Sequence, residues 1–366
     1  MESLTASAAI TYQSKLSMNP YESELTYPLG DTLPASGTTT EVAPGVRWLR
    51  MGLPFALNHI NLWLLDDGEG WTVVDCGIAN DATRTAWEQI FAQELGGRPI
   101  TRVIVTHCHP DHVGLSAWLC ERWQASLWMT VGEYGFARMM SAALPGADGP
   151  SMVPHFRRHG LTDPERLAQL EGRKNYYPTL VPKVPEHFIR LDERYPVRIG
   201  AHDWRVITGT GHSPEHAALY CDALGVLISG DMVLPRISTN TSVFAVEPEA
   251  DAVGHFLDSL QKFLPLPEET LVLPSHGKPF RGLQRRIAQL HAHHSERLDE
   301  VRQACATPQS AADIVPLMFQ RELDTHQLTF AMGEALAHLH RLWQAGELTR
   351  IAGDDGVLRF VRTTAA

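Results

Sequence analysis

The chain has 366 residues, of which 44% are hydrophobic and 20% are charged, and its formal net charge is −11. This length and composition predict an ordinary globular protein with room for one large domain and a small one. The negative charge argues against a general nucleic-acid binder, because such binding depends on Lys and Arg side chains. No apolar run approaches membrane-spanning length, so we expect no membrane partner.

The five cysteines are odd in number and have no paired spacing, which predicts reduced thiols in a cytoplasmic protein. Residues 1–19 lack the charged start and apolar core of a secretory signal. Residues 1–39 are rich in Ser, Thr, Pro and Gly, and we expect them to form an N-terminal arm that packs late or not at all.

The first half of the chain alternates strand and helix patterns, which predicts an α/β layered domain. Asp75 follows the third predicted strand. It is either an ordinary loop residue or a group that orients a metal-bound histidine, and the sequence weighs these roles evenly. The expected elements are a hairpin at 40–53 around Pro44-Gly45, strands at 58–65, 71–74 and 102–106, and an amphipathic helix at 81–95.

A dense cluster of polar side chains, His107-Cys108-His109-Pro110-Asp111-His112, follows strand 102–106 and precedes a helical pattern. Residues two apart in extended backbone point the same way, so His107 and His109 can share one ion. Pro110 turns the chain and can direct Asp111 and His112 toward a second ion nearby. Cys108 should point the opposite way, into the packing. Imidazole and carboxylate ligands suit zinc, iron or manganese.

The second half repeats this design, because three more strand patterns end in single ligand-type residues: His212, Asp231 and His276. The expected strands are 204–208, 217–220, 226–228 and 270–273. The ligands then divide into two sites that share Asp231 as a bridge, His107, His109 and His212 at one and Asp111, His112 and His276 at the other. His216 is expected to support these ligands or the fold rather than bind metal.

As a set, Asp75-Cys-Gly, the 107–112 cluster, Gly211-His212, Gly230-Asp231 and Ser275-His276-Gly277 resemble the metallo-β-lactamase superfamily. The resemblance covers about residues 40–280 and implies a four-layer αβ/βα sandwich with a dinuclear metal site. True β-lactamases of this fold usually lack an aspartate at the position of Asp231. The sequence is therefore more similar to the glyoxalase II-like branch and the branch of β-lactamase-like protein 2.

Two further regions complete the predicted organisation: a helical insert at about 133–185 and a C-terminal domain at 281–366. The insert is either a solvated cover or a basic lid for an acidic substrate group, and Tyr177 and Lys278 are the candidate substrate contacts. Three helices and a hairpin in the tail resemble a winged helix, although its ten basic and ten acidic side chains favour a structural or dimerising unit over a nucleic-acid reader. The histidines at 291, 293 and 294 are expected on a solvated helix face.

The function expected from these residues is hydrolysis of an ester, thioester or lactone of a small molecule by a hydroxide that bridges two divalent ions. Zinc is the expected metal, with iron or manganese as alternatives, and Asp111 would both ligate and handle the proton of the nucleophile. The alternatives are a ribonuclease or phosphodiesterase of the same superfamily, a winged-helix binding protein with a vestigial metal site, and a mononuclear iron oxidant. A homodimer is among the expected assemblies.

Overall fold

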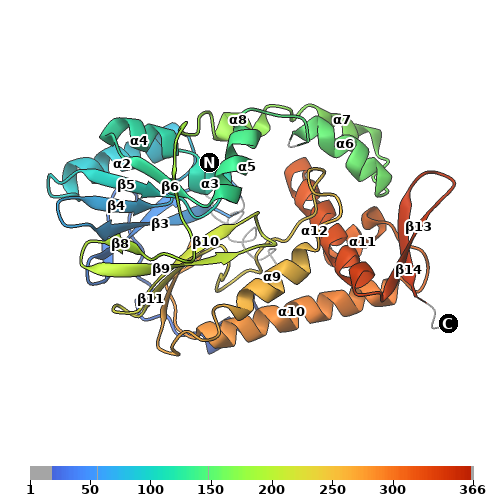
Figure 1. Cartoon of the computed structure of the whole chain (residues 1–366). Coiled ribbons are helices and arrows are strands. Elements are labelled where there is room, and N and C mark those ends of the chain that lie inside the picture. The colour runs from blue at the N-terminus through green and yellow to red at the C-terminus, as the bar shows by residue number, and fades with distance from the viewer. Residues whose placement is uncertain (1–18, 56, 147, 364–366) are drawn as a thin grey trace, which may run out of the picture.

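Two β-sheets packed face to face form the centre of the molecule, which a computed structural model describes over residues 19–55, 57–146 and 148–363 (Figure 1). The first sheet has seven strands, in the order β1 Thr40–Ala43, β2 Val46–Gly52, β3 His59–Asp66, β4 Trp71–Val74, β5 Ile100–Ile104, β6 Ser126–Met129 and β7 Ile189–Arg190. The second sheet has the order β12 Leu271–Pro274, β11 Val226–Gly230, β10 His216–Cys221, β9 His202–Gly209 and β8 Val197–Ile199.

The central strands are buried on both faces, as their unbroken apolar sequences predict. Within β3, every residue from Ile60 to Leu65 is buried. The inner face of the first sheet meets the second sheet, and there Trp48 and Trp63 share a core with Trp204 and Leu219. Full burial of a large apolar side chain stabilises the fold by about 1.5–3 kcal/mol, so the contact between the two sheets contributes strongly to the stability of the folded protein.

Helices cover the outer face of each sheet, so the four-layer sandwich is confirmed. Trp87 and Leu119 of the helices α2 Asp81–Gln93 and α4 Ser116–Trp123 pack on the first sheet, together with α5 Val131–Ser141. Phe256 and Leu290 of α9 Ala252–Gln261 and α10 Leu283–Ala304 pack on the second. The strands β6, β7 and β8 and the helix α9 are elements that the sequence analysis did not predict.

The insert and the C-terminal tail share one apolar core beside the sandwich (Figure 1). Phe156 and Leu170 of the insert pack with Ile314, Leu336 and Phe360 of the tail. The insert helices are α6 Gly149–Arg158, α7 Pro164–Glu171 and α8 Tyr176–Leu180, and the tail adds α11 Ala311–Met318, α12 Thr325–Gln344 and the hairpin β13 Leu348–Ala352 with β14 Leu358–Arg362. The helices α6 and α7 thus bury one face in this core, while most of their other residues are intermediate or exposed, and the choice between a solvated cover and a basic lid stays open. The resemblance of the tail to a winged helix stays a prediction.

Two expectations are wrong. Residues 19–39 are docked rather than loose: they include the short helix η1 Glu22–Glu24, Leu25 is buried, and Thr26 pairs with Arg281. Residues 1–18 of the predicted arm lie outside the described residues. His294 is fully buried, because α10 packs on the second sheet and also on α12. Within the part of the chain that the structure describes, no helix carries an apolar stretch that would cross a bilayer.

Candidate metal centre

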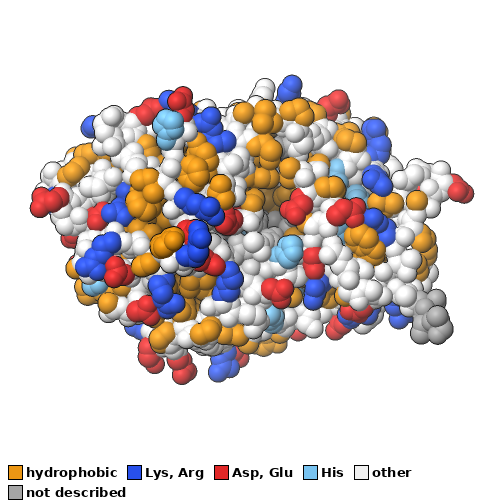
Figure 2. Space-filling view, in the orientation of Figure 1, with side chains coloured by type: hydrophobic (Ala, Val, Ile, Leu, Met, Phe, Trp, Pro, Cys, Tyr) orange, Lys and Arg blue, Asp and Glu red, His pale blue; other side chains and the backbone are white. Residues whose placement is uncertain are grey.

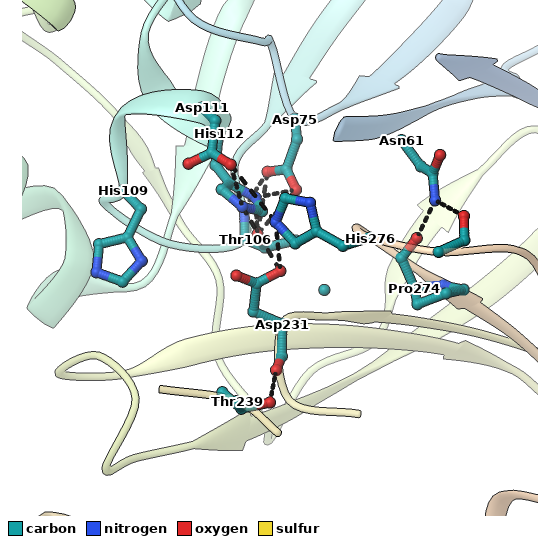
Figure 3. Close-up of polar contacts among 12 residues, drawn as sticks. Asn61, Asp75, Thr106, His109, Asp111, His112, Asp231, Thr239, Pro274 and His276 are labelled. Carbon is teal, nitrogen blue, oxygen red and sulfur yellow. Dashed lines mark hydrogen bonds and ion pairs between the residues drawn. The ribbon is translucent and has the colours of Figure 1, made fainter. Parts of the chain in front are cut away.

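The predicted ligands gather at one edge of the sandwich, where strands from both sheets end. Figure 3 labels His109, Asp111, His112, Asp231 and His276 among them. β4 and β5 run parallel in the first sheet, and β11 and β12 run parallel in the second, so their carboxyl ends meet at the same edge. His107 and His109 follow β5, Asp231 follows β11, and His276 follows β12. Asp111 and His112 lie on the single turn α3 Pro110–Val113, which begins at Pro110.

One group of donor atoms comes from His107, His109, His212 and Asp231, all within 4.8 Å of one another. The Nε2 atom of His107 lies 2.9 Å from Nδ1 of His109 and 3.3 Å from Nε2 of His212. Oδ2 of Asp231 lies 3.4 Å from that same His212 nitrogen. Three imidazoles and a carboxylate therefore surround one point, as predicted.

The second group comes from Asp111, His112 and His276, whose donor atoms also lie within 4.8 Å of one another. Oδ2 of Asp111 lies 3.5 Å from Nε2 of His276 and 3.7 Å from Nε2 of His112. The other oxygen of Asp231, Oδ1, lies 3.5 Å from Nε2 of His276. The two oxygens of Asp231 thus face different groups, which is the arrangement that a bridging ligand requires.

The hydrogen bonds around the centre engage the Nδ1 atoms of two histidines and leave their Nε2 atoms facing the centre. Nδ1 of His212 lies 2.7 Å from the carbonyl of Asn240, and Nδ1 of His276 lies 2.8 Å from the carbonyl of His59. Each Nδ1 must donate to its carbonyl, so in the neutral ring Nε2 carries a lone pair. Nε2 of His112 and Oδ1 of Asp231 are buried and have no hydrogen-bond partner among the residues that the structure describes. These unsatisfied groups fit a pair of cations.

The charges of the centre also favour cations. Burial would raise the pKa of Asp231, but His276 and His112 hold that pKa well below its usual range. Burial would lower the pKa of His112, whereas the carboxylates of Asp75, Asp111 and Asp231 raise it to about 10. Without metal, the imidazole of His112 is therefore protonated on both nitrogens and positively charged at neutral pH. Cation binding must displace one of these protons, so metal affinity should rise with pH.

Asp75 and His216 support the ligands from behind. Oδ2 of Asp75 lies 2.8 Å from Nδ1 of His112, and its Oδ1 accepts a 2.8 Å hydrogen bond from the backbone N–H of Thr106. This contact favours the orienting role over the ordinary loop role. Nε2 of His216 accepts a hydrogen bond from the backbone N–H of Asp231. An added Cβ at Gly230 would lie 2.2 Å from this nitrogen, so glycine is required there.

Two residues that hold the ligand loops were not predicted from the sequence. The buried carboxylate of Glu133 accepts hydrogen bonds from the N–H of Cys108, from the hydroxyl of Ser213 and from the N–H of Glu215, and so joins the loops of His107 and His212. Asn61 donates to the carbonyls of Pro274 and Gly277 on either side of His276. A single Asn within the apolar strand β3 indicates a buried polar role for Asn61 from the sequence alone. No pattern in the sequence around Glu133 indicates its role.

The two predicted substrate contacts are engaged elsewhere in the protein. The ammonium of Lys278 lies 2.8 Å from Oδ1 of Asp31 and faces the ring of Tyr27. Tyr177 is buried, and its hydroxyl donates to the carbonyl of Cys108. Tyr177 thus helps to hold the loop of His107 and His109. The side chain of Cys108 packs in the apolar core, as expected.

A sandwich with convergent histidine and aspartate ligands at its edge is the architecture of a metal-dependent hydrolase. The family model described as "Metallo-beta-lactamase superfamily" matches residues 57–276, and that described as "Metallo-beta-lactamase-like, C-terminal domain" matches residues 298–363. The chain belongs to the metallo-beta-lactamase superfamily.

Similar proteins support this assignment. The chain is 60% identical to a beta-lactamase domain protein from Burkholderia ambifaria of known structure, with a TM-score of 0.89 over 94% of this chain and 100% of that one. It is 27% identical to the metallo-beta-lactamase family protein TTHA1429 from Thermus thermophilus, with a TM-score of 0.74 over 88% and 100% of the two chains. It is also 23% identical to the probable metallo-hydrolase YqjP from Bacillus subtilis over 322 residues, 80% of this chain and 90% of YqjP.

Proposed function

We propose that the protein is a dinuclear hydrolase that cleaves an ester, thioester or lactone bond in a small molecule. The observation that carries the proposal is the position of Asp231 between the two donor groups. Its Oδ2 lies 3.4 Å from a nitrogen of one group, and its Oδ1 lies 3.5 Å from a nitrogen of the other. A carboxylate so placed can ligate two cations at once, and paired cations are a recurring device of hydrolytic enzymes.

When bound, two divalent cations, for which zinc is the expected metal, supply Lewis acidity toward a carbonyl oxygen and lower the pKa of water. His107 and His112 are fully buried, whereas His109, Asp111 and His212 are partly exposed. The substrate therefore approaches from the side of the exposed ligands. Asp111 lies on that side, and its carboxylate can accept the proton of the attacking water as well as ligate.

Metal analysis and a substrate panel test the proposal together. We expect two cations per chain, and turnover of chromogenic esters, thioesters or lactones that is lost on chelation and restored by zinc. His109→Ala and Asp231→Asn should each abolish turnover. Turnover that survives chelation or these substitutions would overturn the proposal. Cleavage of single-stranded RNA without ester or thioester hydrolysis would overturn it in favour of the ribonuclease alternative.

A further inference from the structure

A cluster of flat side chains and one guanidinium, which we call the Arg173 cluster, lies where three distant segments meet. It comprises Phe55 from the β2–β3 loop, Arg173 and Tyr176 from the insert, and His326 and Phe330 from α12. The rings of Phe55 and His326 stack with their centroids 5.6 Å apart, and the ring of Phe330 is 4.9 Å from that of His326. All five side chains are only partly buried, so their free edges remain accessible.

Each of the three segments that form the Arg173 cluster is linked by hydrogen bonds to a loop or side chain of the candidate metal centre. Tyr177, the neighbour of Tyr176, donates to the carbonyl of Cys108. His59, four residues after Phe55, accepts a hydrogen bond from His276. On α12, Glu334 binds the side chain of Asn240, whose carbonyl accepts from His212.

Glu334 lies eight residues beyond His326, about 12 Å along the helix at 1.5 Å per residue. The cluster therefore shares its three segments with residues that support the candidate metal centre. Figure 2 shows that the surface is hollowed between the sandwich and the C-terminal helices.

The cluster offers positive charge and hydrogen-bond donors. The guanidinium of Arg173 lies 3.8 Å above the ring centre of Tyr176, and its Nη2 lies 3.1 Å from Nδ1 of His326. Because Arg173 can only donate, Nδ1 of His326 accepts, and the proton of that neutral ring is on Nε2. Burial lowers the pKa of Arg173, and the carboxylate of Asp324 partly offsets this, but among the described residues no carboxylate forms a salt bridge with Arg173 within 4.0 Å. Its remaining N–H groups are thus available to an oxyanion.

We propose that the Arg173 cluster is a substrate subsite, which binds a carboxylate or phosphate oxyanion of the ester or thioester to be cleaved and packs its rings against the adjoining apolar part. A guanidinium forms paired hydrogen bonds with such oxyanions, and its stacking on Tyr176 holds it in place for this contact. The subsite rests on the proposed function. It deepens that function by selecting anionic over neutral substrates.

The test compares matched substrates in the holoenzyme. 4-Nitrophenyl butyrate is neutral, and its hemiglutarate counterpart carries a carboxylate. Butyryl-coenzyme A carries phosphates, and the butyryl thioester of N-acetylcysteamine does not, so the two pairs distinguish the two sources of the oxyanion. Arg173→Gln should lower kcat/KM by about tenfold to a hundredfold for the anionic member of at least one pair, through KM, and leave the neutral members unchanged. Lys174→Gln, the exposed neighbouring cation, is the matched control and should have no effect.

Equal losses for neutral and anionic substrates, or no loss, would overturn the subsite. Its failure is distinguishable from failure of the proposed function by calorimetric binding of glutarate and coenzyme A to the chelator-treated protein, in which no metal can bind the anion. Binding that weakens in Arg173→Gln supports the subsite even if wild-type protein hydrolyses no ester. Binding equal in both proteins contradicts it.

Discussion

Replacement of Asp75 by Asn should weaken metal binding at one of the two proposed positions and leave the other unchanged. The two side chains have the same shape, so Asn can still accept the hydrogen bond from the N–H of Thr106 through its Oδ1. Its amide then takes the place of the oxygen that lies 2.8 Å from Nδ1 of His112. An amide donates where the carboxylate accepted, so the proton of His112 is forced onto Nε2, the atom that faces Asp111 and His276.

The magnitude follows from the single contact that is reversed. Loss of an orienting partner behind a metal-bound histidine lowers metal affinity by about 10–100-fold, or about 1.4–2.7 kcal/mol. We expect titration of the metal-free variant with zinc, in competition with a chelator, to give one position of wild-type affinity and one that is weaker by this factor. In the metal-free variant the pKa of His112, held at about 10 partly by Asp75, should also fall, which NMR titration would detect.

Wild-type affinity at both positions, or equal weakening of both, would contradict this prediction, since His112 is the one candidate ligand that contacts Asp75 within the described residues. Asp354→Asn is the control, because Asp354 is exposed and lies in the turn between β13 and β14, far along the chain from the centre. It removes the same charge and should change neither position. A thermal melt of the metal-free proteins checks that both variants fold.

Three further changes test the supports of the centre. Gly230→Ala would place its Cβ 2.2 Å from His216 at a φ of +55°, whereas Gly225→Ala has a φ of +61° and open space; denaturant unfolding should show the first variant to be the less stable by more than about 1 kcal/mol. Glu133→Gln alters a carboxylate that accepts three hydrogen bonds, so the free energy of unfolding of the protein should fall by about 1–3 kcal/mol. An unchanged free energy of unfolding would show that the loops do not depend on Glu133. Burial raises the pKa of Glu334 to about 7. The protonated carboxyl therefore contributes its full stabilisation of the folded protein below the unfolded pKa of about 4.5, and this contribution is lost as the pH rises through 7. Glu334→Gln should therefore gain up to about 3 kcal/mol on the wild type between pH 5 and pH 8 in urea unfolding of the metal-free proteins, and a constant difference would contradict the shifted pKa.

The strands and helices of the sandwich could be predicted because the hydrophobic pattern of each one lies within a short stretch of sequence. The strand expected at 71–74 is β4, and the helix expected at 81–95 is α2 within two residues. The candidate metal ligands were predictable for the same reason. His107 to His112 are adjacent in sequence, and each remaining ligand follows the end of a strand, so strand ends at one sheet edge were enough to predict that they meet.

The sequence alone was enough to predict an α/β layered domain and two groups of candidate metal ligands, because strand periodicity and residue spacing carry that information, whereas the sandwich was implied by the resemblance to a family. Only the tertiary structure decided that the insert shares a core with the C-terminal helices, that Glu133 joins two ligand loops, and that Arg173 meets Phe55 and His326. These contacts join segments far apart in the chain. Such contacts depend on how whole layers pack and leave no periodic pattern in any one segment.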